Sequence, residues 1–123
     1  MSLPRVLAPG NGVAVCWLGN LSWLIAFQER LIAFDLDLDR EQRVQPSPIP
    51  TADIAPVLDV QFITHKHGDH FNEVSSRILA QESDCLFVLP ANCVDKAHGL
   101  GISSTRILVA RPGEPFDVLG VHV

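Results

Sequence analysis

Every apolar run in this 123-residue chain is short enough to be a single β-strand, and this limits the fold more than any other feature. Such runs include residues 13–18 and 31–34, and turn-forming or polar residues separate them from the next apolar segments. A membrane-spanning helix needs about 18 or more consecutive apolar residues. The sequence therefore predicts a protein without a membrane partner, built from short strands.

The order of the elements indicates a mixed α/β sheet in one domain over residues 1–123. Three runs joined by short turns predict an antiparallel meander, and later strands alternate with helical patterns, which is typical of parallel pairing. The expected strands are 13–18, 22–27, 30–35, 60–64, 86–89 and 107–110, with a strand pair or one bent strand over 116–123. The expected helices are 71–82 and 91–98, the second ending at a Gly99 cap.

Residues 39–56 differ in composition and predict a Pro-rich surface loop. Four prolines lie in this segment, which has few bulky apolar residues. The loop is expected to finish in one helical turn capped by Thr51.

Charge and cysteine content exclude several classes of protein. Nine Lys and Arg against fourteen Asp and Glu give 9 − 14 = −5, which argues against a nucleic-acid partner, because such proteins carry a basic patch or stripe. Three cysteines are an odd count without zinc or disulfide spacing. We expect structural thiols in a reducing compartment, and hence a cytoplasmic protein.

Several side chains are assigned structural roles. Trp17 and Trp23 are expected to pack in the core. Ser75, Ser76 and Arg77 are expected on the solvated face of the 71–82 helix.

The densest group of functional side chains is Thr64-His65-Lys66-His67-Gly68-Asp69-His70, directly after an apolar strand. On an extended backbone, His65 and His67 project to the same side, where two imidazoles can bind one divalent ion at about 2.0–2.1 Å each. Gly68 permits a change of direction, so Asp69 and His70 are aimed at an adjacent position, suited to a second ion. A chance cluster on a solvated loop would have to reproduce this spacing where a buried strand ends. The motif therefore predicts a site for two divalent ions.

His65-x-His67-x-Asp69-His70 matches the HxHxDH signature of the metallo-β-lactamase superfamily. The segments Trp17-Leu18-Gly19, Ser22-Trp23-Leu24-Ile25 and Leu31 to Asp35 resemble its opening meander. The chain is most similar to the L-ascorbate-6-phosphate lactonase-like branch, through Pro50, Asp53-Ile54, Asp59, Leu100-Gly101-Ile102 and Pro112-Gly113-Glu114.

The resemblance implies the N-terminal half of an αββα sandwich. It places His65 and His67 on the first metal and Asp69 and His70 on the second, with Asp69 also assigned to catalysis. Asp35 is implied to orient a metal-binding histidine through a hydrogen bond; the alternative is an ordinary aspartate at a strand end.

Three further ligands of the family have no credible counterpart in these residues. His122 lies in a strand pattern, and His98 is expected to cap a helix C-terminus. We therefore expect a single incomplete domain that is inactive alone.

The implied activity is that of a metal-dependent hydrolase, in which a metal-bound hydroxide attacks a lactone, ester or phosphoester. The cofactors would be two divalent ions, Mn or Zn, with Fe compatible. The resemblance to the lactonase-like branch alone implies that the small-molecule substrate is a phosphorylated sugar acid. It also implies that the protein assembles into a homo-oligomer. Two alternatives stay open: a phosphodiesterase of the same superfamily, and a non-catalytic assembly module with a partial metal site.

Overall fold

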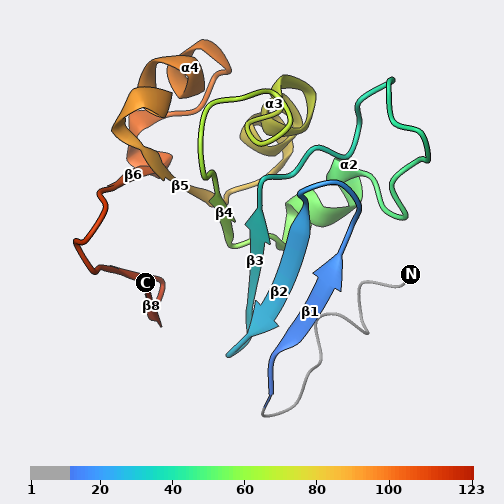
Figure 1. The fold of residues 1–123 in the computed structure, drawn as a ribbon. Coiled ribbons are helices and arrows are strands. Elements are labelled where there is room, and N and C mark those ends of the chain that lie inside the picture. The colour runs from blue at the N-terminus through green and yellow to red at the C-terminus, as the bar shows by residue number, and fades with distance from the viewer. Residues whose placement is uncertain (1–11) are drawn as a thin grey trace.

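Six strands form one mixed sheet in which the strands follow chain order, in a computed structural model that describes residues 12–123 (Figure 1). A separate two-stranded sheet, β7–β8, follows near the C-terminus. The strands are β1 Ala14–Trp17, β2 Trp23–Phe27, β3 Arg30–Phe34, β4 Val60–Phe62, β5 Leu86–Pro90, β6 Ile107–Ala110, β7 Asp117–Val118 and β8 Val121–His122. The helices are α2 Thr51–Ile54, α3 Glu73–Glu82 and α4 Val94–Gly99, with 3₁₀ turns η1 Ala55–Val57, η2 Ala91–Cys93 and η3 Ser104–Arg106. The predicted mixed α/β sheet with flanking helices is confirmed.

Strands β1 to β3 pair antiparallel, as the sequence predicts for the meander. The turn between β2 and β3 consists of Gln28 and Glu29, with φ angles of 49° and 64°. Two central residues in the left-handed region are typical of a hairpin turn whose twist matches that of its strands. This turn forms without the Gly or Asn that usually occupies it.

Strands β3 to β6 pair in parallel, so their carboxyl ends lie at one edge of the sheet. Asp35 follows β3, the histidine-rich segment follows β4, and η2 and α4 follow β5. Chain segments far apart in the sequence are therefore brought together at this edge.

The two faces of the sheet pack against different parts of the chain. One face packs against the helices in a large core that includes Leu24, Leu31 and Phe87 from strands and Ile54 and Leu79 from helices. The opposite face carries a smaller apolar cluster that takes in residues of β7 and β8 and none from α2, α3 or α4.

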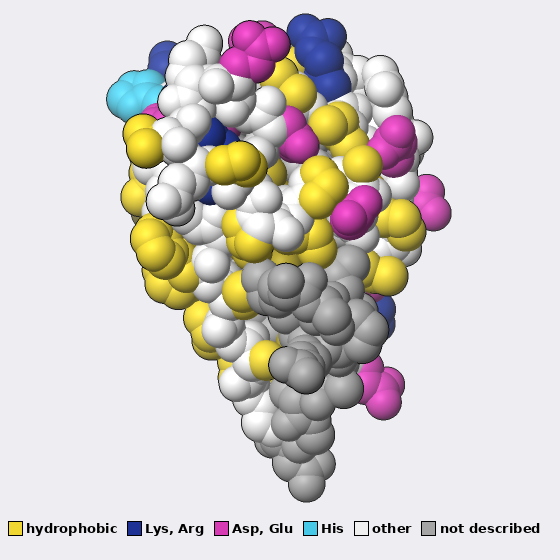
Figure 2. Space-filling model, turned by 90° about the vertical axis from the view of Figure 1, so that its right-hand side faces the viewer, with side chains coloured by type: hydrophobic (Ala, Val, Ile, Leu, Met, Phe, Trp, Pro, Cys, Tyr) yellow, Lys and Arg dark blue, Asp and Glu magenta, His cyan; other side chains and the backbone are white. Residues whose placement is uncertain are grey.

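Trp17 and Trp23 are not in the core, so that prediction was wrong. They are 59% and 41% exposed and lie against each other, with ring centroids 6.4 Å apart. Strand alternation explains this, because Leu24 takes the helix side and its neighbour Trp23 points to the other. On the side of the molecule with β1 and α2, hydrophobic side chains are scattered over the surface with Asp and Glu between them (Figure 2).

The segment 39–56 is only partly a surface loop. Most of its first ten residues are exposed, but Ile49, Thr51, Ile54 and Ala55 are buried beneath the sheet. Pro50 occupies the N-cap position of α2 without a side-chain cap, and the Thr51 hydroxyl instead donates to Asp39 Oδ2 at 2.5 Å. The predicted cap role of Thr51 was therefore wrong.

Ser75 and Ser76 are buried, contrary to the predicted solvated face. Ser75 Oγ accepts from the Leu38 backbone amide at 3.1 Å and donates to Asp39 Oδ2 at 3.0 Å, which ties α3 to the segment after β3. A short hydroxyl with backbone and carboxylate partners can be buried at low cost. Periodicity alone does not reveal such partners.

We expect Ser75→Ala to lower the free energy of unfolding by about 1–3 kcal/mol, because it leaves the buried Leu38 amide without an acceptor. The matched control is Ser76→Ala. Ser76 Oγ is equally buried and has no hydrogen-bond partner among residues 12–123, so its removal should be neutral or stabilising. Urea unfolding of both variants checks the difference, and equal losses would contradict it.

Across residues 12–123, none of the helices has the length and apolar character required to cross a membrane.

Candidate metal centre

The histidine-rich segment forms a compact turn at the carboxyl end of β4. Ile63 continues the sheet, with its amide donating to Val88 O at 2.9 Å, and the chain then leaves the ladder. His67 O accepts from the amides of both His70 and Phe71, at 2.9 and 2.7 Å. This turn folds the second half of the motif back over the first.

The turn brings three imidazole rings together. The centroids of the His65 and His67 rings are 4.8 Å apart in an edge-on arrangement, and those of His65 and His70 are 3.8 Å apart. The rings of His65 and His67, which the sequence predicts on one side of the chain, are thus close together.

Asp35 anchors the turn from the end of β3. It is 3% exposed, and its carboxylate accepts from the Thr64 amide at 2.8 Å and the Thr64 hydroxyl at 2.6 Å. Its Oδ2 also lies 2.8 Å from His70 Nδ1. This carboxylate favours the tautomer with the proton on Nδ1, which leaves the Nε2 lone pair for a ligand.

The donor atoms are chemically suited to a divalent ion but do not complete a site. His70 Nε2 lies 3.8 Å from Asp69 Oδ2, a separation that one ion at about 2.0–2.2 Å from each atom can bridge. The His65 and His67 rings are close enough to offer one nitrogen each to another ion. Within residues 12–123, however, no three or more His, Cys, Asp or Glu side chains are arranged to hold a metal. The residues present therefore supply pairs of possible ligands for a divalent ion.

Sequence reasoning assigned no role to three residues that fix this turn. Thr64 Oγ1 lies 3.0 Å from His65 Nδ1 as well as contacting Asp35. Arg40 Nη2 donates to Gly68 O at 2.9 Å, and Lys96 Nζ donates to the backbone of the turn from α4. The position of Thr64 beside the motif was a usable signal. Arg40 and Lys96 donate to backbone carbonyl groups, and because every residue has a carbonyl group, the sequence does not show which of them is the acceptor.

The remaining two histidines lie on other elements and have other partners. His122 is in β8, as predicted, with Nδ1 2.9 Å from Asp117 Oδ1. His98 lies in the last turn of α4, but its Nε2 contacts Ser104 Oγ at 3.0 Å, a side-chain contact that the predicted cap role did not include. Gly99 is the last residue of α4, and the left-handed glycine is Gly101 instead.

The cysteines are poor nucleophiles. Burial raises the pKa of the Cys85 and Cys93 thiols, so the reactive thiolate is suppressed at neutral pH. This agrees with their predicted structural role.

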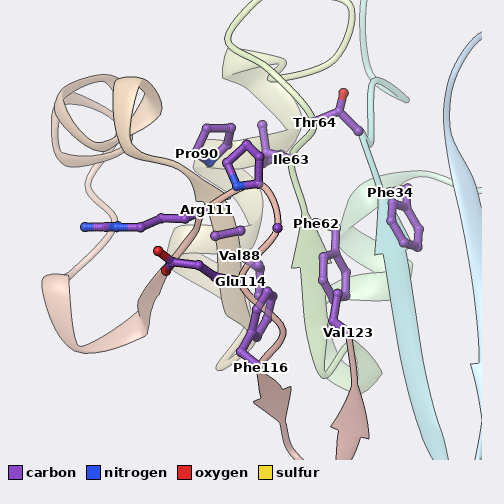
Figure 3. Close-up of a pocket in the computed structure, with 13 residues that line it drawn as sticks. Phe34, Phe62, Ile63, Thr64, Val88, Pro90, Arg111, Glu114, Phe116 and Val123 are labelled. Carbon is purple, nitrogen blue, oxygen red and sulfur yellow. The ribbon is translucent and has the colours of Figure 1, made fainter.

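An apolar groove of about 460 Å³ begins beside the turn and runs along the face of the sheet opposite the helices. Thr64 lies at one end, and Phe34, Phe62, Val88 and Phe116 form much of the wall (Figure 3). Arg111 and Glu114 point away from these rings in the same view (Figure 3). The groove therefore has an apolar lining and a polar end at the strand that leads into the histidines.

Sequence comparison gives short matches to lactonases. The protein named "Probable L-ascorbate-6-phosphate lactonase UlaG" of Escherichia coli O139:H28 (strain E24377A / ETEC) is 29% identical over 68 residues, which are 54% of this chain and 19% of that protein. The protein of the same name from Salmonella newport (strain SL254) gives the same values. The match thus spans about a fifth of the length of these curated relatives. No family model matches the chain.

Solved structures match over a larger part of the chain. Igni18, a metallo hydrolase from Ignicoccus hospitalis KIN4/I, has a TM-score of 0.65 at 17% identity and covers 85% of this chain and 42% of its own. Isothiocyanate hydrolase from Delia radicum gut bacteria has a TM-score of 0.65 at 16% identity, over 86% of this chain and 44% of its own. CmlA, a diiron beta-hydroxylase from Streptomyces venezuelae, has a TM-score of 0.64 at 15% identity. The match covers 89% of this chain and 22% of the CmlA chain.

These structures share the arrangement of this sheet and its helices over less than half of their own chains. They include hydrolases and a hydroxylase, so the fold alone does not fix the reaction. The sheet order, the turn after β4 and these matches lead to one structural assignment: the chain has a partial metallo-β-lactamase-like fold.

Proposed function

We propose that the chain is part of a metal-dependent hydrolase that uses the turn after β4 to bind divalent ions. The observation that carries this proposal is the hydrogen bond from His70 Nδ1 to the buried Asp35, at 2.8 Å. A carboxylate that fixes the tautomer of a histidine is the usual partner of a metal-binding imidazole. An ordinary strand-end aspartate would not need to reach a histidine 35 residues away.

His65 and His67 would hold one ion, and Asp69 and His70 the other. Bound ions would supply a hydroxide nucleophile at neutral pH and polarise the bond under attack. The chain's own contribution is orientation: Asp35 holds His70, and Thr64 links that carboxylate to His65. We assign Asp69 a catalytic as well as a metal-binding role, because its exposed carboxylate lies beside His70 Nε2.

The substrate we propose is a small lactone, ester or phosphoester, with a phosphodiester as the alternative within the same chemistry. The short match to lactonases supports the lactone. His and carboxylate ligands suit Mn, Zn or Fe, and we propose Mn or Zn. The odd cysteine count supports a reducing, cytoplasmic location.

We expect His67→Ala to reduce the affinity for Zn²⁺ at least tenfold, because it removes one of the two rings that would share an ion. The measurement is a titration of the chain with Zn²⁺ in competition with a chromophoric chelator. His122→Ala is the matched control, since this exposed histidine lies in β8 and is bonded to Asp117. Equal affinity in both variants would overturn the site assignment.

A second proposal, assembly, is favoured by the sheet face opposite the helices. Val15, Trp17 and Trp23 are exposed there, and exposed apolar patches of this kind mark association surfaces. We therefore propose that the chain is inactive alone and associates through this face with a second copy of itself, as a homo-oligomer. Light scattering of the wild type and of Trp17→Ser tests this. A monomer at all concentrations would contradict it.

A further inference from the structure

We propose that Lys96, on α4, is a positioning residue that holds the metal-binding turn in its binding geometry. This inference rests on the function proposed above, since it concerns how the same turn is shaped. It names a residue 26 positions beyond the end of the motif, on a different element.

The Lys96 ammonium bonds to both ends of the turn. Nζ donates to Lys66 O at 2.9 Å and to Phe71 O at 2.6 Å. Lys66 lies between His65 and His67, and Phe71 directly follows His70. One side chain therefore fixes the backbone beside three of the four proposed ligands.

The ammonium also contacts an aromatic ring. It lies 4.8 Å from the centroid of the Phe71 ring, a cation–π contact, and Phe71 itself is fully buried. The Lys96 stem is only partly exposed on α4, whose neighbour Ala97 is in the core. Lys96 thus connects the packed interior to an otherwise exposed turn.

Arg40 gives the turn a second support. Arg40 Nη2 donates to Gly68 O and also pairs with the buried Asp37 carboxylate, at 2.7 Å. Arg40 and Lys96 therefore contact the turn from two different elements. A loop held at several carbonyls loses less conformational entropy when it binds a ligand.

Lys96 acts on the backbone and does not act as an acid or base. Two of its three N–H donors point to carbonyl oxygens of the turn, and neither acceptor belongs to a side chain that would bind metal. Its effect on a bound ion passes through the orientation of the histidines.

The test compares Lys96→Met with Lys96→Arg, and uses Arg77→Met as the control for removal of a charge from an exposed helix position. Two quantities are measured on the chain: the dissociation constant for Zn²⁺, and the hydrogen-exchange rates of the His70 and Phe71 amides without metal. We expect Lys96→Met to weaken Zn²⁺ binding about tenfold or more and to speed exchange at both amides. Lys96→Arg should preserve both values, because a guanidinium also donates to carbonyls and stacks on an aromatic ring.

Each result decides the inference. Unchanged exchange in Lys96→Met would overturn it, and so would faster exchange with unchanged Zn²⁺ affinity. If the wild type binds no Zn²⁺, the proposed function fails, and the exchange rates alone decide whether Lys96 holds the turn. If Lys96→Met does not fold, Lys96→Gln replaces it, because its side chain keeps one donor group. It should weaken Zn²⁺ binding and speed amide exchange in the same direction but by a smaller factor.

Discussion

Replacing Asp35 with alanine should both destabilise the fold and weaken metal binding. The change removes the buried carboxylate that accepts from the Thr64 amide and hydroxyl, and a hydrogen bond to a charged group contributes about 1.5–3 kcal/mol. Asp35 also has a φ of 48°, and alanine in the left-handed region adds about 1 kcal/mol. We expect a total loss of about 3 kcal/mol in the free energy of unfolding, and a 10- to 100-fold weaker affinity for Zn²⁺ because His70 loses its orienting partner.

Asp35→Asn is the matched control for this experiment. Asparagine tolerates the left-handed conformation and keeps one oxygen for the Thr64 amide, but its amide nitrogen cannot accept from His70. We expect it to recover much of the stability and little of the metal affinity. Urea unfolding and Zn²⁺ titration separate the two effects. Wild-type affinity in both variants would show that Asp35 does not act on the site.

Replacing Phe71 with alanine should have the largest effect on folding. Phe71 is fully buried and directly follows His70, so it attaches the metal-binding turn to the core. Truncating a buried phenylalanine costs about 3–5 kcal/mol, which is a large part of the stability of a small domain. The same change removes the ring beneath the Lys96 ammonium.

Phe71→Leu is the matched control, because it removes the aromatic ring but keeps most of the buried volume. It should lower the free energy of unfolding by less than about 1.5 kcal/mol. Chemical unfolding followed by the two tryptophans gives both values. A loss below about 1 kcal/mol for Phe71→Ala would mean that the core relaxes around the cavity and that the turn is not attached through this ring.

The sequence predicted the sheet because each apolar run has the length and punctuation of a strand. It also predicted that His65, His67, Asp69 and His70 lie together, since they are adjacent in the chain and follow a buried strand. The prediction about Asp35 came from a resemblance, and the structure places its carboxylate against His70.

The errors have a common physical cause. Trp17, Trp23, Ser75 and Ser76 were assigned to the interior or the surface by residue type. Their actual burial depends on which face of an element meets the rest of the chain. The contacts of Lys96 with the turn were equally beyond prediction, because they depend on the packing of α4 against residues 25 or more positions away.

The parallel arrangement of β3 to β6 has a consequence for how such a chain can diversify. The segments that follow the carboxyl ends of these strands carry Asp35, the histidine-rich turn and, on α4, Lys96, whereas the ladder that holds the strands together involves the backbone of other residues. Changes at the exposed positions of these segments, away from buried residues such as Asp35 and Phe71, leave the ladder intact. A new specificity can therefore be selected at this edge while the sheet serves unchanged as the scaffold.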